Sequence, residues 1–382
     1  MPNPTSRLAG LRSAFFSNQN GIFGASISHK LGYDLCVLAR MGDDMRRIAS
    51  AIFMFSAVVG GWLFSQQPAS AWGAFGHLTV CDLAYRNLTD PSRAELKKTF
   101  HAGQGGITVH AKDGTELRHY TSFNVGCLEE DETPRKHPAD HFVNLDRTTG
   151  SILSASCPAG GSCIFAGIDR DLAILKDRSK SDEDRVFALM AIGHWIGDIH
   201  QPLHISFADD KGGNAIKARV SGGCGTSSYR PRNLHAVWDG CLLEAGLFQK
   251  VRKRADFKAS WGRRTITYRA VDTLLANTSL TDEQQMVATA PAIWANESLQ
   301  ITLQPAVQYC VKVASSCNYS NSQASLGEGD EERSVALGND YLATYAPIAE
   351  DRVRKAGFRL AHLINLALDP EYQGPTKDSL QP

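Results

Sequence analysis

The stretch His194-Trp195-Ile196-Gly197-Asp198-Ile199-His200-Gln201-Pro202-Leu203-His204 is the starting point for predicting the fold of this chain. It ends a helical pattern that begins near Ser181, a residue type suited to a helix N-cap, and Pro202 stops the helix because proline lacks an N–H. His194 and Asp198 are four residues apart and share one helix face, and Gly197 leaves room beside them for another element. An imidazole and a carboxylate one turn apart form half of a metal site, and His204 follows just past the helix end.

A second pair of residues has the same spacing. His235 and Asp239 are one turn apart in Asn233-Leu234-His235-Ala236-Val237-Trp238-Asp239. His141 stands before Phe142, and Asp131 lies ten residues earlier. A single His/Asp pair is usually a surface hydrogen bond or ion pair. Two such pairs, together with the further candidates Asp131, His141 and His204, lie within about 110 residues, and this favours metal binding.

The composition is that of an ordinary globular protein. The chain has 382 residues, of which 43% are hydrophobic, and this is enough for a large core. It has no internal repeat and no central linker rich in Pro, Gly or Ser, which favours one domain.

The N-terminal segment resembles a targeting sequence. Arg46-Arg47 precede an apolar run over 48–64, and Ala69-Ser70-Ala71 form a small-x-small cleavage site before Trp72. This pattern indicates a secretory signal peptide over 41–71, with residues 1–40 an upstream mis-start or an extra leader and 72–382 the mature domain. The alternative is an uncleaved membrane anchor, but the run is short for a spanning helix and contains Ser and Gly.

Removal of this leader changes the charge and the cysteine count. It takes away six of the 40 basic and three of the 40 acidic side chains, which leaves a net charge of −3. Bulk electrostatics then cannot hold nucleic acid, so phosphate binding requires metal ions. Eight cysteines remain, an even number that suggests disulfides. Cys157 and Cys163 bracket a tight loop, as do Cys310 and Cys317, whereas the pairing of the other four stays open.

Helical patterns cover most of the mature chain. We expect helices from about His77 to Asn87 and over 164–177, 182–200, 234–248, 255–275, 282–302 and 347–368. Residues 103–127 indicate a loop or short strand, 318–330 a loop, and 216–220 alternate like a strand. The sequence therefore predicts an all-α fold in one domain with a minor β-hairpin.

Several of these motifs, in this order, resemble the secreted zinc-dependent single-strand nucleases, the family that includes mung bean nuclease. The matching motifs are Trp72-Gly73 with His77, His141-Phe142, the central stretch, Gly212-Gly213-Asn214, and Asn233 to Asp239. Ala356-Gly357 followed by Arg359-Leu360-Ala361 resembles the bacterial branch. The resemblance implies the multi-helix fold that these nucleases share with zinc phospholipase C.

The resemblance also implies a cleft with three zinc ions. One zinc would be bound by Asp131, His141, His194 and Asp198, and a second by His204, His235 and Asp239. The third would take the free α-amino group and carbonyl of Trp72, together with His77 and Asp198. Cleavage before Trp72 would then be needed for activity, because an amide nitrogen is a poor zinc ligand.

The activity implied is hydrolysis of single-stranded DNA and RNA to 5′-phosphorylated products by a metal-activated hydroxide, with 3′-nucleotidase activity as an additional option. Asp131 and Asp198 would serve catalysis as ligands, and Arg135 would stabilise the phosphoryl charge. Phe142 would stack on a base and Asn214 would contact phosphate or base, although core packing and turn chemistry are their ordinary roles. Asn144 stands where fungal members have an acidic residue.

Two other functions are compatible with these motifs. A zinc phospholipase C-like lipid phosphodiesterase has the same fold, but the Gly-Gly-Asn and Asn-Leu-His motifs favour the nuclease. A metal-binding protein without catalysis is the third option, although all nine ligand positions are filled. We expect a secreted or periplasmic protein that acts on nucleic acids and nucleotides, with no stable protein partner and no membrane association after signal cleavage.

Overall fold

The computed structural model describes residues 72–375, apart from short stretches at 102–104, 159–160, 226–228, 277, 288–289, 305–306, 308–309, 314–315 and 320–333. The predicted leader over 1–71 and the last seven residues lie outside the described residues. None of the helices described is both long and apolar enough to span a membrane.

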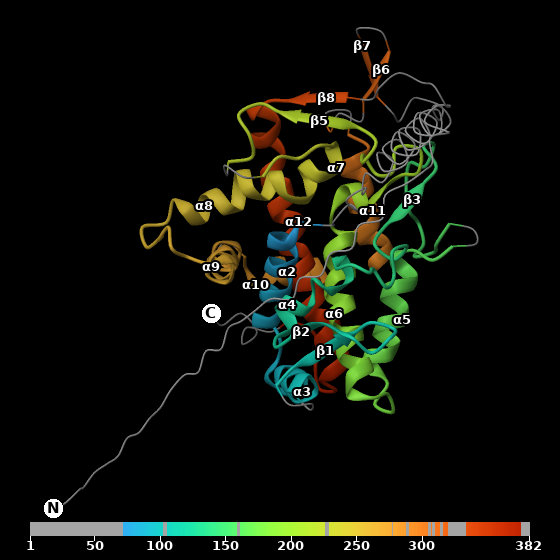
Figure 1. The fold of residues 1–382 in the computed structure, drawn as a ribbon, viewed down its shortest axis with the longest axis vertical. Coiled ribbons are helices and arrows are strands. Elements are labelled where there is room, and N and C mark those ends of the chain that lie inside the picture. Colours follow the sequence, from blue (N-terminus) through green and yellow to red (C-terminus); the bar gives the residue numbers. More distant parts are fainter. Residues whose placement is uncertain are drawn as a thin grey trace, which may run out of the picture. The chain divides into compact units, whose positions relative to one another are not determined.

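Helices dominate the architecture, as predicted (Figure 1). The central helix α6 (Asp182–Ile199) packs against α2 (Ala74–Arg86), α5 (Ile164–Lys176) and α12 (Asn339–Leu368). Ser181 caps α6, since its hydroxyl accepts a hydrogen bond from the Asp184 N–H at 3.0 Å. From Arg185 onward nearly every residue of α6 is buried, so the helix forms the centre of the core and its C-terminal end carries His194 and Asp198.

Shorter helices surround this core. They are α3 (Asp90–His101), α4 (Phe123–Gly126), α9 (Arg263–Leu275), α10 (Leu280–Val287) and α11 (Pro291–Thr302). The predicted helix over 234–248 is a run of α7 (Leu234–Ala236), π-helical turns at Val237–Cys241 and Glu244–Phe248, and α8 (Gln249–Arg252).

The described residues form four two-stranded sheets beside the helices, more than the single hairpin predicted. Two are antiparallel, β1 (Ile107–His110) with β2 (Glu116–Tyr120) and β6 (Cys310–Val313) with β7 (Ser316–Tyr319). Two are parallel, β3 (Val143–Leu145) with β4 (Ile205–Phe207) and β5 (Lys217–Val220) with β8 (Ser334–Leu337). The β3–β4 pair matters for function, because it places the segment after His141 beside the segment after His204.

Three predicted helix boundaries were wrong. The helix expected over 282–302 is divided, because Pro291 starts α11 at its first turn, where a missing N–H costs nothing. The helix expected over 255–275 begins only at Arg263, after Gly262. The helix expected over 347–368 is α12, which begins earlier, at Asn339, so that Pro347 lies inside it. The turns before Pro347 are packed into the core, because Tyr341, Leu342 and Tyr345 are buried.

Three disulfides join the described cysteines: Cys81–Cys127, Cys157–Cys163 and Cys224–Cys241. The short loop closed by Cys157 and Cys163 is as the spacing suggested, and the two longer pairs settle what the sequence left open. The side chains of Cys310 and Cys317 lie outside the described residues. A Cβ added to Gly193 would lie 2.4 Å from the Cys127 sulfur, so glycine lets α6 pass against the Cys81–Cys127 bridge.

Candidate metal centre

Two groups of buried histidine and aspartate side chains meet at the C-terminal end of α6. In the first group His141 Nδ1 lies 3.0 Å from Asp198 Oδ2 and 3.2 Å from His194 Nε2. Asp131, at the end of a 3₁₀ turn over Glu129–Asp131, places its Oδ1 3.7 Å from His194 Nε2. Ligand atoms of His141, His194 and Asp198 all lie within 4.8 Å of one another, close enough to share one metal ion.

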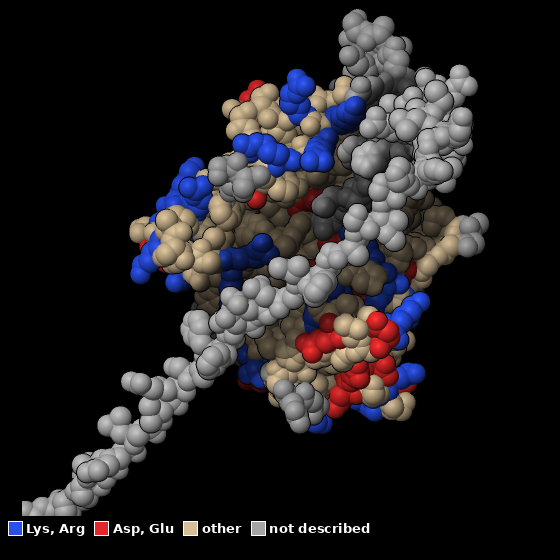
Figure 2. All heavy atoms as spheres, viewed as in Figure 1, with Lys and Arg blue, Asp and Glu red and all other residues tan. Residues whose placement is uncertain are grey.

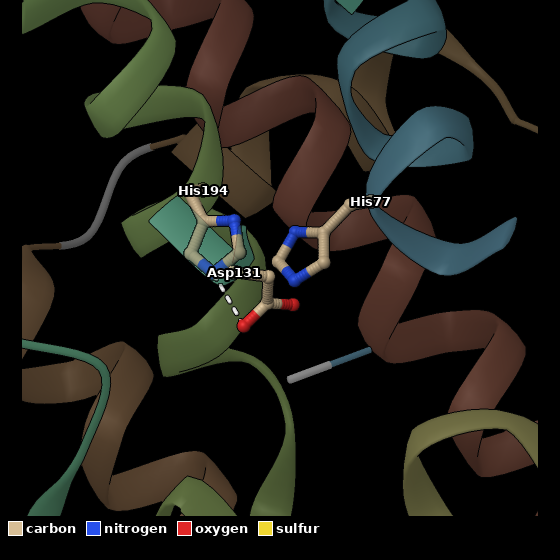
Figure 3. Close-up of side chains that lie close together, drawn as sticks. All are labelled: His77, Asp131 and His194. Atoms are coloured by element: carbon tan, nitrogen blue, oxygen red, sulfur yellow. Dashed lines mark ion pairs between the residues drawn. The ribbon is translucent and has the colours of Figure 1, made fainter. Parts of the chain in front are cut away.

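His77 reaches the same group from α2. Its ring stacks on His194 with centroids 4.0 Å apart, and its Nε2 lies 3.2 Å from Asp198 Oδ1. Figure 3 shows the His77 and His194 rings facing each other beside Asp131. A Cβ on Gly197 would lie 2.7 Å from His77 Nδ1, so glycine at this position provides the room that the sequence indicated.

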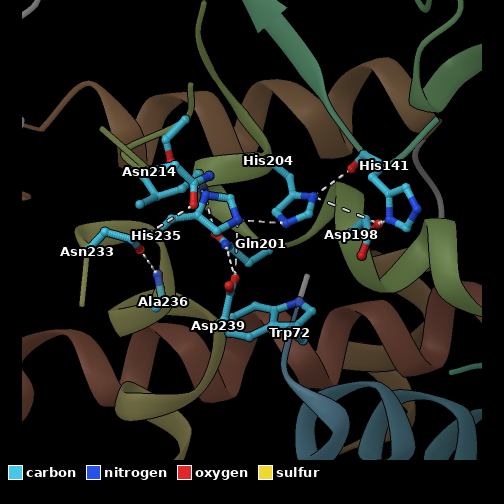
Figure 4. Close-up of polar contacts among 12 residues, drawn as sticks. Trp72, His141, Asp198, Gln201, His204, Asn214, Asn233, His235, Ala236 and Asp239 are labelled. Carbon is cyan, nitrogen blue, oxygen red and sulfur yellow. Dashed lines mark hydrogen bonds and ion pairs between the residues drawn. The ribbon is translucent and has the colours of Figure 1, made fainter. Parts of the chain in front are cut away.

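The second group contains His204, His235 and Asp239 (Figure 4). The two imidazoles approach with their Nε2 atoms 3.1 Å apart, and His235 Nε2 lies 3.5 Å from Asp239 Oδ1. Asn233 caps α7 by accepting the Ala236 N–H at 2.8 Å, which fixes the turn that carries His235 and Asp239. The structure thus places the eight predicted side-chain ligands in two adjacent groups. Asp198 Oδ2 of the first group lies 3.8 Å from His204 Nδ1 of the second.

Three of these imidazoles are held by backbone carbonyls. The Nδ1 atom of His194 lies 2.7 Å from Cys127 O. The Nδ1 atom of His204 lies 2.6 Å from His141 O, and that of His235 lies 2.6 Å from Gly212 O. A carbonyl oxygen only accepts hydrogen bonds, so Nδ1 carries the proton in each ring. The lone pair is therefore on Nε2, which faces the neighbouring ligands. This is the tautomer that a metal-binding histidine requires.

Burial favours the neutral form of four imidazoles of the site, His77, His141, His204 and His235. Loss of solvent, with the neighbouring histidines, holds the pKa of His77 and His141 well below the ordinary value, and burial lowers the pKa of His235 to about 4. Burial raises the pKa of Asp198 and Asp239 well above the ordinary value. Carboxylates and neutral imidazoles gathered away from solvent suit a divalent cation, which favours the ionised carboxylates.

Several polar atoms of the site lack a hydrogen-bond partner among the described residues. They are both ring nitrogens of His77, Nε2 of His141 and Oδ1 of Asp198. Buried polar atoms without partners are rare because each costs desolvation free energy. A bound cation would use the lone pair of one His77 nitrogen and coordinate Asp198 Oδ1, so the donor set fits zinc.

Trp72 lies against both halves of the centre. Its indole N–H donates to Gly197 O at 2.9 Å, and the Gly73 N–H donates to Asp239 O at 2.7 Å. Figure 4 shows Trp72 beside Asp239. These two bonds fix the start of α2 between α6 and the segment that carries Asp239. Whether the Trp72 backbone itself binds a metal stays a prediction.

The predicted substrate-contacting residues lie on or contact segments that also carry candidate metal ligands. Arg135 donates to Asp131 Oδ1 at 2.6 Å. Phe142 is half-buried and does not belong to the hydrophobic core that the described residues form, and Asn144 lies two residues further on β3. The Asn214 side chain donates to Lys211 O at 2.9 Å and accepts from Asn233 at 3.2 Å, so it also serves the turn.

Sequence reasoning missed the role of Gln201. Its amide donates to Asp239 Oδ1 at 2.7 Å while its own oxygen accepts the Leu203 N–H at 2.6 Å. Its position directly before the helix-ending Pro202 was the available signal. His200, which lies between two ligands in the sequence, is not part of either ligand group. It is fully buried, and its Nε2 accepts from Arg359.

Comparisons with known proteins agree with this geometry. A family model described as S1/P1 Nuclease matches residues 72–369. Endonuclease 4 of Arabidopsis thaliana is 26% identical over 337 residues, which cover 85% of this chain and 96% of the relative. Nuclease S1 of Aspergillus oryzae is 26% identical over 303 residues, covering 78% of this chain and 93% of the relative. Nuclease P1 of Penicillium citrinum is 25% identical over 173 residues, covering 44% and 57%.

Proposed function

This chain belongs to the S1/P1 nuclease family, and from that premise we propose that it is a zinc-dependent nuclease that hydrolyses single-stranded DNA and RNA to 5′-phosphorylated products. We further propose that it removes 3′-phosphates from nucleotides. The observation that carries the proposal is the convergence of imidazoles and carboxylates in three sets whose ligand atoms lie within 4.8 Å of one another: His77 with Asp131 and His194, His141 with His194 and Asp198, and His204 with His235 and Asp239.

We assign the ligands of three zinc ions. Asp131, His141, His194 and Asp198 would hold one ion, and His204, His235 and Asp239 a second. His77, Asp198 and the backbone of Trp72 would hold the third. When bound, zinc would act as a Lewis acid that supplies a nucleophile at neutral pH and balances the negative charge of the phosphoryl group. Gln201 and the carbonyls of Cys127, His141 and Gly212 orient these ligands.

Arg135 is the cation that we place beside the reacting phosphate. Its guanidinium is largely buried and joined to Asp131, which holds it at the edge of the first group of ligands. A planar guanidinium can donate to two phosphate oxygens at once, so it would bind the scissile phosphate and stabilise charge that develops on it.

Phe142 is the residue that we expect to select unpaired strands. Its ring is half-buried, directly follows His141, and lies outside the hydrophobic core of the described residues. A base can stack on such a ring only when it is free of a duplex, and stacking tolerates every base. Asn144 and Asn214 would contribute polar contacts to the same strand.

Export is part of the proposal. We propose that residues 1–71 are removed and that the mature protein is secreted or periplasmic. The three disulfides support an oxidising compartment. A free α-amino group at Trp72 would then complete the third zinc site.

The test is a substrate comparison with purified mature protein. Single-stranded DNA, duplex DNA of the same sequence and a phosphatidylcholine emulsion are each incubated with and without a zinc chelator. The proposal expects chelator-sensitive cleavage of the single strand, products with 5′-phosphates, and much slower cleavage of the duplex. Lipid hydrolysis without DNA cleavage would assign a phospholipase, and zinc binding without either activity would assign a binding protein.

A further inference from the structure

A strongly basic segment lies outside the metal centre. Residues 250–264 contain seven lysines and arginines and a single acid, Asp256, in a chain whose formal net charge is zero. We call this segment the basic arm. It comprises most of α8, the turn that follows, and the start of α9. In Figure 1 the turn between α8 and α9 projects from the side of the helical body, and Figure 2 shows blue side chains along the same edge.

Most of the positive charge on the basic arm is not neutralised. Lys250 pairs with Glu350 and Arg254 with Asp256. The other five cations are exposed, and none of them forms an ion pair within the part of the chain that the structure describes: Arg252, Lys253, Lys258, Arg263 and Arg264. Like charges that are close together repel one another, so this cluster favours a polyanionic partner.

The basic arm is an ordered element. Phe257 and Trp261 meet edge to face with centroids 5.5 Å apart, and both rings pack against the core. The Trp261 N–H donates to Lys258 O at 2.9 Å, which closes the turn. The cations are therefore presented on a fixed backbone, which lowers the entropy cost of binding an extended partner.

The segments between the basic arm and the metal centre also carry exposed arginines, Arg219, Arg230 and Arg232, which we call the positive surface. Gln249, at the base of the arm, donates to Gly225 O at 2.6 Å, and the Cys224–Cys241 disulfide anchors the same loop. From that loop the chain continues through exposed Arg230 and Arg232 to Asn233, which caps the turn carrying His235. Exposed Arg219 lies on β5, whose neighbour Ala218 donates its N–H to Arg232 O.

We propose that the basic arm binds the phosphate backbone of single-stranded nucleic acid outside the metal centre. The arm would hold a long strand while the positive surface leads one phosphodiester to the zinc ligands. The expectation that phosphate binding requires metal ions considered only the total charge of the chain. Local charge acts within the screening distance, so such a surface allows a protein of near-zero net charge to hold a polyanion. The inference rests on the proposed nuclease function and identifies long strands as the preferred substrates.

The experiment compares two variants of mature protein with equal charge changes. The arm variant replaces Arg252, Lys253, Lys258, Arg263 and Arg264 with Gln. The control variant replaces five exposed lysines of α3, the β1–β2 turn and the α5 region with Gln: Lys97, Lys98, Lys112, Lys176 and Lys180. For each protein, kcat and KM are measured over a range of salt concentrations on a long single strand and on a dinucleotide.

The arm variant should lose about tenfold in kcat/KM on the long strand at low salt, mainly through KM, while cleaving the dinucleotide normally. Its logarithmic salt dependence on the long strand should be shallower, by about 0.7 for each phosphate that the variant no longer neutralises. The control variant should match the wild type. Dinucleotide cleavage and zinc content also show that the arm variant is folded.

Equal losses in both variants would overturn the inference, as would an unchanged ratio of long-strand to dinucleotide activity. Binding to anionic lipid vesicles is measured as well. If the wild type binds them, the arm variant does not, and long-strand cleavage is unchanged, the partner is a lipid surface instead. If wild-type protein cleaves neither nucleic acid substrate, the proposed function itself fails, and that result is distinct from a failure of the arm.

Discussion

At the scale of single residues, the metal centre depends on groups that hold the ligands. His194, His204 and His235 each donate Nδ1–H to a carbonyl, and Asp239 accepts from Gln201. These partners select the tautomer and orientation before a cation arrives, so the free energy of binding is not spent on ordering the rings.

Gln201→Ala tests this orientation. The substitution leaves Asp239 without its amide donor, and we expect zinc affinity at the His204–His235–Asp239 group to fall about tenfold. Competition with a fluorescent chelator measures it. Gln300→Ala is the control, because among the described residues that exposed glutamine hydrogen-bonds only to Gly150 O and, at the distance limit, to Asn296. Equal affinity in wild type and Gln201→Ala would show that Asp239 needs no such support.

Gly197→Ala tests the approach of two helices. The new methyl group would meet His77 Nδ1 at 2.7 Å, within fully buried surroundings. We expect the free energy of unfolding to fall by about 1–3 kcal/mol and activity to drop, because the His77 ring must move. Gly150→Ala has open space around its Cβ and should change neither quantity. An active, fully stable Gly197→Ala protein would contradict the packing described.

Much of the site could be predicted at this scale, because helical spacing is a local property. His194 with Asp198, and His235 with Asp239, follow from the four-residue repeat alone. The carbonyl partners could not be predicted, since Cys127 O lies 67 residues from His194 and Gly212 O lies 23 from His235. Long-range contacts of this kind depend on the packed fold and leave no periodic pattern in the sequence.

At the scale of elements, non-local pairing assembles the centre. The parallel β3–β4 pair joins residues 143–145 to 205–207, and its register explains why His141 O can accept from His204. The sequence predicted neither strand, because three-residue strands are too short to show alternation. It did predict α6 closely, since a cap, an acidic first turn and a terminal proline all agree.

Helix α10 contains a buried carboxyl that should make stability depend on pH. Glu283 is 3% exposed, its Oε2 has no hydrogen-bond partner among the described residues, and burial raises its pKa to about 7 from 4.5. The folded state therefore binds this proton more tightly than the unfolded state. The cost of ionisation is absent below pH 4.5, grows as the pH rises to about 7, and is constant above that.

Glu283→Gln should remove this cost. We expect the variant to be more stable than the wild type by about 1–3 kcal/mol at pH 8, with a difference near zero at pH 4, as measured by urea unfolding. Glu116→Gln, at an exposed position, should show no such pH dependence. If the difference in unfolding free energy between the wild type and Glu283→Gln is the same at both pH values, the carboxyl is in contact with water and the account is contradicted.

At the scale of the whole molecule, one disulfide connects two segments that carry ligands. Cys81–Cys127 closes a loop of 46 residues and ties α2, which contains His77, to the turn that precedes Asp131. Cys157–Cys163 closes only six residues. The stabilisation from a cross-link grows with the length of chain that it closes.

Replacing both Cys81 and Cys127 with Ser should therefore lower the free energy of unfolding by about 2–4 kcal/mol and reduce zinc retention. The Cys157→Ser, Cys163→Ser protein should lose less stability and keep its zinc. Thermal unfolding and metal analysis of the two proteins measure the difference. The reverse order of effects would show that the longer bridge does not hold the centre together.

The zinc content of the exported protein, with its N-terminal residue determined by mass spectrometry on the same sample, tests the proposed metal centre most directly. We propose that Trp72 becomes the first residue and that its backbone completes a third zinc site beside His77 and Asp198. We therefore predict Trp72 at the N-terminus and about three zinc ions per chain, against about two in a precursor that retains residues 1–71. Three zinc ions in the uncleaved precursor, or two in a chain that begins at Trp72, would contradict this assignment.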